Sequence, residues 1–152
     1  MKTALLLLTM SALVLGARAN DAHDGDTAAA ADREAVHQAV NDYVTAVYEA
    51  KPELIERSVS KELTKFGFYR NAETGEYSKH PMTYDELHEL SKTYKDSGYL
   101  SDDPPKAIHV FEVLDKIANV KLTADWGVDY MQLAKEDGTW KIAQVIWQSP
   151  PQ

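Results

Sequence analysis

Residues 107–147 read AIHVFEVLDKIANVKLTADWGVDYMQLAKEDGTWKIAQVIW, and this stretch decides the fold. Along residues 117–124 every second side chain is apolar, from Ala118 to Ala124. A period of two is typical of a strand with one buried face, and residues 127–134 show a similar alternation. Gly138 ends a hairpin loop at a place where a positive φ angle is needed. The stretch therefore predicts a four-stranded antiparallel meander.

The last strand of this meander, residues 140–147, is apolar on both faces. We therefore expect a central strand that is covered on both sides. Gly127 follows Trp126 directly, which predicts a bulge that bends the sheet into a trough.

The segments before residue 107 predict mainly helices. Apolar spacing favours a long helix over residues 33–50 and a short one from Pro52, and residues 63–78 favour a short strand with a partial return. Residues 82–87 read MTYDEL, in which Thr83 and Glu86 form a capping box for a helix over residues 84–95. Helices segregated from an antiparallel sheet define the α+β class. A bent sheet wrapped on the long helix makes a cone with a pocket at its open end.

The N-terminus has the pattern of a secretory signal peptide. Lys2 precedes an apolar core, and Ala17, Arg18 and Ala19 form a small-x-small cleavage site. We expect cleavage after Ala19, a flexible leader over residues 20–31 and one domain over residues 32–152. The apolar run is too short for a transmembrane helix. The sequence thus predicts an exported protein, periplasmic or extracellular, with no membrane contact after cleavage.

Charge and cysteine content exclude several partner classes. The formal net charge is −8 at pH 7, and cleavage after Ala19 removes two further positive charges. Nucleic acids and anionic membrane surfaces would be repelled by this charge. The chain has no cysteine, which excludes disulfides and a lipoprotein anchor. It also has no glycine-rich phosphate loop, serine nucleophile elbow or paired-histidine zinc motif, so we expect no cofactor and no metal.

The order of elements, with YMQLAKEDGTWKIAQVIW at residues 130–147, resembles the nuclear transport factor 2-like superfamily. Within it, the chain is most similar to the family called "putative lumazine-binding". The resemblance covers nearly the whole of residues 32–152. It implies the cone fold and a small-molecule ligand, with a planar, lumazine-like heterocycle as the ligand that the family name suggests. The superfamily includes isomerases, cyclases, dehydratases and binding modules, so the fold alone does not choose among them.

Two residues are candidates for acid–base chemistry. Asp129 shares a strand face with Met131 and Leu133, so its carboxyl group should point inward, where burial raises the pKa. The alternative is a carboxylate paired with an arginine or a backbone donor. His109 lies on the face of Phe111 and is either a proton carrier in the pocket or a hydrogen-bonded core residue.

Aromatic residues supply the candidate ligand-binding surface. Planar heterocycles stack on such side chains, and we expect Tyr69, Tyr84 and Trp126 near the mouth of the pocket together with Asp129 and His109. In the similar ketosteroid isomerases a tyrosine on the first helix stabilises an oxyanion, and Tyr43 stands at a similar place. Residues 59–65, however, lack the aspartate base of those enzymes, so Tyr43 is predicted to pack with its hydroxyl at the pocket rim.

Three functions remain open at this point. The first is an exported small-molecule-binding protein. The second is a cofactor-independent enzyme of isomerase, cyclase or dehydratase type that uses Asp129 or His109. The third is an accessory module that dimerises through the outer face of the sheet, and the apolar strand over residues 140–147 favours a homodimer under all three.

Overall fold

The computed structural model describes residues 17–150, with side chains described from residue 26 onward. Three α-helices and a short 3-10 helix accompany six strands. The helices are α1 (Ala17–Glu49), α2 (Pro52–Ser58), α3 (Tyr84–Thr93) and η1 (Tyr94–Asp96). The strands are β1 (Val59–Arg70), β2 (Tyr77–Met82), β3 (Ala107–Val113), β4 (Ile117–Ala124), β5 (Gly127–Glu136) and β6 (Thr139–Gln148).

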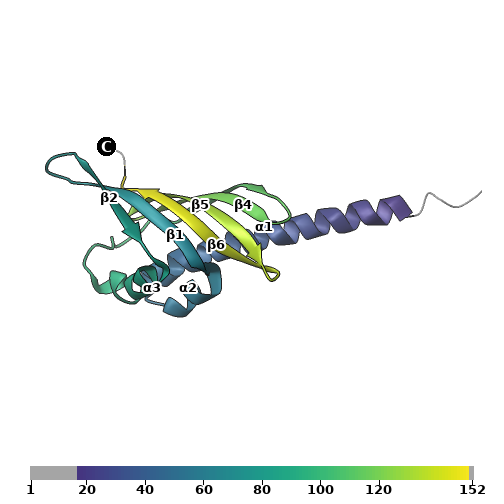
Figure 1. Cartoon of the computed structure of the whole chain (residues 1–152), viewed down its shortest axis with the longest axis horizontal. Coiled ribbons are helices and arrows are strands. Elements are labelled where there is room, and N and C mark those ends of the chain that lie inside the picture. The colour runs from purple at the N-terminus through teal and green to yellow at the C-terminus, as the bar shows by residue number, and fades with distance from the viewer. Residues whose placement is uncertain (1–16, 151–152) are drawn as a thin grey trace, which may run out of the picture.

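The strands form one curved sheet in the order β2-β1-β6-β5-β4-β3, and the helices lie on one side of it (Figure 1). The predicted meander from β3 to β6 is confirmed, because each of these strands pairs antiparallel with the next. Strand β6 lies between β1 and β5, which confirms the predicted central position. The expected cover on both sides is wrong, because the helices lie on one side only (Figure 1) and Ile146 on β6 is 38% exposed. The β1–β6 pair is parallel, so the first and last strands of the chain meet in the middle of the sheet.

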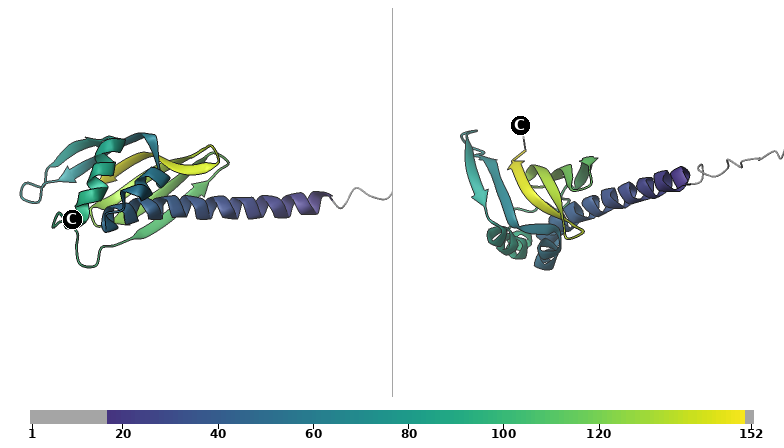
Figure 2. Two further views of the ribbon diagram at one scale, coloured as in Figure 1. Left: turned by 90° about the horizontal axis from the view of Figure 1, so that it is seen from below. Right: turned by 45° about the vertical axis from the view of Figure 1, so that its right-hand side comes forward.

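Helix α1 packs against the sheet only along its C-terminal half. Val36, Val40, Tyr43 and Val47 are almost fully buried there, in the stripe that the sequence predicted. The helix begins at Ala17, and its first turns extend beyond the sheet (Figure 2). Residues 20–31, expected as a flexible leader, are thus part of this helix, and the side chains described over residues 26–31 are exposed. The cleavage site after Ala19 and the preceding apolar core remain predictions, and residues 1–16 lie outside the described residues.

The capping box predicted at Thr83 is present at the start of α3. The Thr83 backbone N–H donates to the Glu86 carboxylate at 2.7 Å, and the Glu86 N–H donates to the Thr83 hydroxyl at 3.3 Å. These bonds satisfy two backbone donors that a helix start leaves free. The α-helix ends at Thr93, and η1 continues the helical path to Asp96. The predicted end at Lys95 therefore lies within η1. Leu87 is fully buried and fixes α3 against the core.

The N-terminal strands are longer than the sequence predicted. β1 spans twelve residues and pairs with both β6 and β2, where a short strand with a partial return was expected. The bulge predicted at Gly127 is wrong, because β4 and β5 pair without a register shift up to Ala124 and Gly127. Gly127 instead has a φ of 131°, and a Cβ atom there would collide with the carbonyl oxygen of Gln148. A register shift does occur between β5 and β6, beyond the Gln132–Gln144 pair.

Within residues 17–150, no helix is both long enough and apolar enough to cross a membrane.

Candidate functional site

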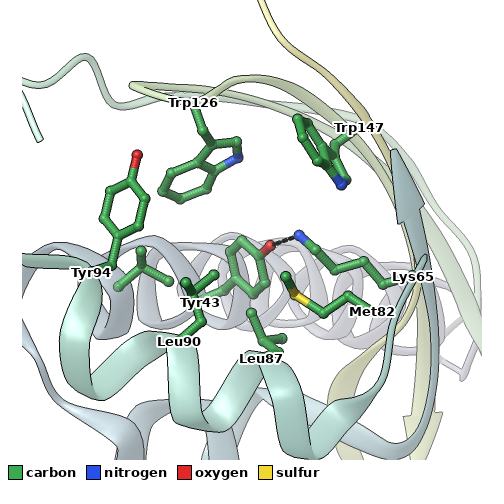
Figure 3. Close-up of a pocket in the computed structure, with 9 residues that line it drawn as sticks. Tyr43, Lys65, Met82, Leu87, Leu90, Tyr94, Trp126 and Trp147 are labelled. Atoms are coloured by element: carbon green, nitrogen blue, oxygen red, sulfur yellow. Dashed lines mark hydrogen bonds between the residues drawn. The ribbon is translucent and has the colours of Figure 1, made fainter. Parts of the chain in front are cut away.

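A cavity of about 130 Å³ lies between α1, α3 and the inner face of the sheet. Its walls are almost entirely apolar (Figure 3). Nine residues line it: Tyr43, Val47, Lys65, Met82, Leu87, Leu90, Tyr94, Trp126 and Trp147. One wall therefore comes from α1, one from α3 and η1, and the remainder from β1, the ends of β2 and β6, and the turn between β4 and β5.

A buried lysine and a buried tyrosine form the polar part of this cavity. The Nζ atom of Lys65 donates a hydrogen bond to the hydroxyl of Tyr43 at 2.5 Å (Figure 3). Lys65 is 7% exposed and Tyr43 is 1% exposed. Burial lowers the pKa of Lys65 below its ordinary value, against the opposing effect of Asp129. Burial also raises the pKa of Tyr43 well above its ordinary value, and Asp129 adds to that rise.

Asp129 lies behind this pair and is fully buried. One carboxyl oxygen, Oδ1, accepts a hydrogen bond from the indole N–H of Trp126 at 3.0 Å. The other, Oδ2, has no hydrogen-bond partner among the described residues. Burial raises the pKa of Asp129, while Lys65, Trp126 and Tyr43 act in the opposite direction. Because burial shifts the lysine and the aspartate in opposite directions, both are moved toward their uncharged forms.

Tryptophans form the flat surfaces of the cavity. Trp126 contacts the rings of Tyr43, Tyr48 and Tyr94 edge-on, with centroid distances of 6.1, 5.6 and 5.9 Å. The Tyr48 hydroxyl accepts a hydrogen bond from the Asp125 N–H at 2.8 Å and thereby holds the turn that carries Trp126. Edge-to-face contacts of this kind are the preferred arrangement of aromatic pairs.

Trp147 lies on the opposite side of the cavity from Tyr94 (Figure 3). It pairs with Gly67 of the neighbouring strand, and a Cβ atom on Gly67 would overlap its indole ring. Its indole N–H is buried and has no hydrogen-bond partner among the described residues, and in Figure 3 it is directed toward the Lys65 amine. An unpaired buried donor beside a buried amine is a place where a ligand oxygen would be stabilised.

The residues that the sequence nominated divide into three groups. Tyr43 and Trp126 line the cavity, with the Tyr43 hydroxyl buried on Lys65 and not at a rim. Asp129 points inward, as the alternation of β5 predicted, but does not line the cavity.

The third group lies outside the cavity. Tyr69 is 49% exposed and contacts His80 on the β1–β2 hairpin. Tyr84 is buried and stacks on His88 of α3. His109 is exposed and contacts the ring of Phe111 at 4.6 Å, so it neither lies in the core nor faces the cavity.

Sequence reasoning did not nominate Lys65 or assign Trp147 to the site. A usable signal existed in β1, where Leu63, Lys65 and Gly67 occupy alternate positions and so share one strand face. If that face packs against a helix, the lysine between the apolar residue and the glycine must be buried. A buried ionisable group marks a candidate functional site. Trp147 pairs with Gly67 of β1, and the missing side chain at Gly67 leaves room for the Trp147 ring at the cavity.

Among the described side chains, no cluster of three or more His, Asp or Glu residues is arranged to hold a metal ion. The polar groups at the cavity are the Lys65 amine, the Tyr43 hydroxyl and the indole N–H of Trp147, with the buried Asp129 carboxyl group behind them. Amines, hydroxyls and indoles can donate hydrogen bonds to an oxygen atom, and an amine next to a phenol can exchange a proton with it.

Comparison with solved structures identifies the fold. The chain is similar to an NTF2-like protein of unknown function from Silicibacter pomeroyi DSS-3, with 22% identity and a TM-score of 0.60 over 76% of this chain and 93% of that one. A second NTF2-like protein, from Shewanella baltica OS155, shows 17% identity and a TM-score of 0.58 over 81% and 97%. A putative scytalone dehydratase from Novosphingobium aromaticivorans DSM 12444 shows 15% identity and a TM-score of 0.52 over 80% and 85%.

At these identities the similarities establish the fold and not the activity. No curated protein matches the chain. The family model described as "Putative lumazine-binding" matches residues 31–148, which includes every strand and the packed half of α1. The chain therefore belongs to this family, and its fold is that of the NTF2-like structures to which it is similar.

Proposed function

We propose that this protein binds one small, flat, mainly apolar molecule in the cavity and orients it through a single oxygen atom. The observation that carries the proposal is the unpaired indole N–H of Trp147 beside the buried amine of Lys65, at the edge of otherwise apolar walls. A carbonyl oxygen placed there would accept from both donors. Pockets of this composition, apolar with a few polar groups, are typical of small-molecule sites.

The size of the cavity limits the ligand. An apolar cavity of about 150 Å³ accommodates a benzene ring, and this one measures about 130 Å³. A single planar ring therefore fits without rearrangement. A bicyclic heterocycle such as lumazine, which the family description names, requires side chains at the mouth to move, and Met82 and Leu90 are flexible enough to do so.

Calorimetric titration with lumazine and with a single-ring analogue, 2-pyridone, tests this proposal. We expect one binding site per chain for at least one of the two compounds. Trp147→Phe keeps an aromatic ring, though a smaller one, and removes the indole N–H. We expect it to weaken binding about tenfold, or about 1.4 kcal/mol.

The matched control is Trp140→Phe. Trp140 also donates its indole N–H, at 3.0 Å to Asp32, but it lies outside the cavity. An unchanged affinity in this variant is expected. Absence of binding by both compounds, or equal weakening by the two tryptophan variants, would contradict the proposal.

A second candidate function is proton transfer on a bound ligand, of isomerase, cyclase or dehydratase type. It is supported by Tyr43, which lines the cavity and interacts with the buried Asp129 behind it. His109 has no part in this candidate because it lies away from the cavity. In D₂O, hydrogen exchange next to the carbonyl group of a bound ketone, lost in Asp129→Asn while binding is kept, would favour the enzyme. Binding without exchange would favour the simple binding protein.

We further propose that binding takes place outside the cytoplasm. The support is the basic start, apolar run and Ala17–Ala19 pattern of the N-terminus. N-terminal sequencing of protein secreted by its host is the direct test, with Asn20 as the expected first residue. A mature protein that retains Lys2 would contradict this proposal.

A further inference from the structure

Lys65 differs from an ordinary strand lysine in both its surroundings and its partner. Its side chain is more than nine-tenths buried and lies in the wall of a cavity that is otherwise apolar. Its amine has no carboxylate in direct contact within the described residues, and its hydrogen-bond partner is the neutral hydroxyl of Tyr43. Amines of lysine become nucleophiles when a hydrophobic pocket favours the uncharged form.

We propose that Lys65 forms a reversible imine with small aromatic aldehydes or ketones that enter the cavity. The proposal rests on the ligand-binding function above, since the cavity must admit the ring, and it assigns the carbonyl group of the ligand a covalent partner. The flat walls of Trp126 and Trp147 would hold the ring, which leaves its carbonyl carbon facing the Lys65 amine.

The chemistry balances without any added reagent. The lone pair of the Lys65 Nζ atom attacks the carbonyl carbon, the C=O π pair moves to oxygen, and one N–H proton follows it to give a carbinolamine. The C–O bond then breaks, the nitrogen lone pair forms the C=N bond, and the second N–H proton leaves. Water is the only by-product, and no oxidant or reductant is consumed.

Tyr43 is placed to shuttle the proton in the second step. Its oxygen already accepts an N–H from Lys65 at 2.5 Å, so it is able to take up the N–H proton while its own O–H proton passes to the departing hydroxyl group. A concerted exchange of this kind creates no tyrosinate. That suits a hydroxyl whose ionisation is disfavoured by burial, since burial raises the pKa of Tyr43. The indole N–H of Trp147 would hold the carbonyl oxygen during attack.

Lys61 provides a matched comparison on the same strand. It lies four residues earlier in β1, is exposed, and holds its amine over the ring of Tyr84 at 3.9 Å. Its pKa is raised by its interaction with Tyr84, whereas burial lowers the pKa of Lys65. At neutral pH the two amines therefore differ in the fraction that is uncharged.

The test is reductive trapping with benzaldehyde and sodium cyanoborohydride at pH 7, followed by peptide mapping. We expect Lys65 to carry the benzyl group at least about tenfold faster than Lys61, because only the Lys65 amine lies in the wall of a cavity that would hold the aldehyde next to it. Toluene, which has the ring but no carbonyl group, is expected to slow labelling of Lys65 and not of Lys61. Tyr43→Phe is expected to slow labelling of Lys65 while the protein still takes up toluene.

Two variants of Lys65 test whether the label requires the amine itself and not only a charge or an apolar side chain at this position. Lys65→Arg keeps a positive charge and Lys65→Met keeps the length of an apolar side chain; both are expected to lose the label, and Lys61→Arg to keep it. Equal labelling of Lys61 and Lys65 in the folded wild-type protein, or labelling of Lys65 that toluene leaves unchanged, would overturn the imine proposal. If 2-pyridone or lumazine binds by calorimetry while Lys65 stays unlabelled, the imine is refuted and the binding function stands. If neither occurs, both fail.

Discussion

The Nζ atom of Lys65 and the hydroxyl oxygen of Tyr43 lie 2.5 Å apart in a hydrogen bond that joins β1 to α1. Both side chains are buried, so neither is exposed to bulk solvent. We expect Tyr43→Phe to destabilise the fold by about 1–3 kcal/mol, because the amine is left without its acceptor. Urea denaturation followed by far-UV circular dichroism measures this.

The control for that experiment is Tyr130→Phe. The Tyr130 side chain is 56% exposed on the other face of the sheet. Its loss of a hydroxyl group is expected to change stability by less than about 0.5 kcal/mol. Equal effects of the two substitutions would show that the Lys65–Tyr43 bond contributes nothing specific.

Asp129 predicts a defined dependence of stability on pH. Its pKa in the folded protein is raised, mainly by burial, so the folded state binds the proton more tightly than the unfolded state does. Its contribution is greatest below the ordinary carboxyl pKa of 3.8 and declines as pH rises through the higher folded-state pKa. Asp129→Asn cannot titrate. The wild-type protein should therefore lose stability relative to Asp129→Asn as pH rises above about 4, by at most about 1.4 kcal/mol per pH unit.

The measurement is the difference in unfolding free energy between the two proteins at several pH values from 4 to 7. Other carboxyl groups titrate equally in both proteins and cancel in this difference. Parallel stability curves would mean that Asp129 has the same pKa in the folded and unfolded states.

Gly67 controls the position of Trp147. A Cβ atom at residue 67 would overlap the indole ring, so Gly67→Ala must displace it into the cavity or away from the sheet. We expect a loss of about 1–3 kcal/mol, as for other overpacked sites, together with loss of ligand binding. Combining Gly67→Ala with Trp147→Leu should recover stability, since the smaller side chain removes the overlap. Additive losses in this double-mutant cycle would contradict a direct clash.

The capping box at Thr83 yields a simple stability prediction. Thr83→Ala removes the acceptor for the Glu86 N–H and should cost about 1 kcal/mol. Glu86→Gln retains a side-chain acceptor for the Thr83 N–H and should cost less. Thermal unfolding of the two variants distinguishes these outcomes, and an equal or larger loss in Glu86→Gln would locate the effect in the charge of Glu86 instead.

We predict that a homodimer would form through the outer face of the sheet. Phe111 and Tyr130 stack there with ring centroids 6.5 Å apart, and both are at least half exposed. Exposed apolar clusters of this kind often mark interaction surfaces. We expect sedimentation velocity to show a dimer that Phe111→Glu dissociates, while Tyr99→Glu, on an exposed loop, has no effect. Sedimentation of the wild-type protein as a monomer would contradict this prediction.

Local periodicity was enough to place Asp129 but not Lys65. The alternation of β5 put Asp129 on the inner face because its neighbours on that face, Met131 and Leu133, are apolar, and all three are buried. In β1 the alternation is ambiguous, because Phe66 and Phe68 make the face opposite Lys65 apolar as well. The choice between the two faces is made by packing against helices that are distant in sequence.

The same limit explains His109. Alternation correctly grouped it with Phe111, and the two rings are in contact. Only the packed structure shows that this face of β3 is turned away from the cavity, at the edge strand of the sheet. The meander and the capping box, by contrast, depend on neighbours in sequence and were predictable.

The parallel pairing of β1 with β6 has a consequence for biogenesis. One wall of the cavity is built from two distant parts of the chain, since Gly67 and Trp147 pair although eighty positions separate them. During synthesis, a chain that still lacks β6 therefore has an incomplete cavity. The wall of the cavity between Gly67 and Trp147 forms only once this last strand has paired with β1.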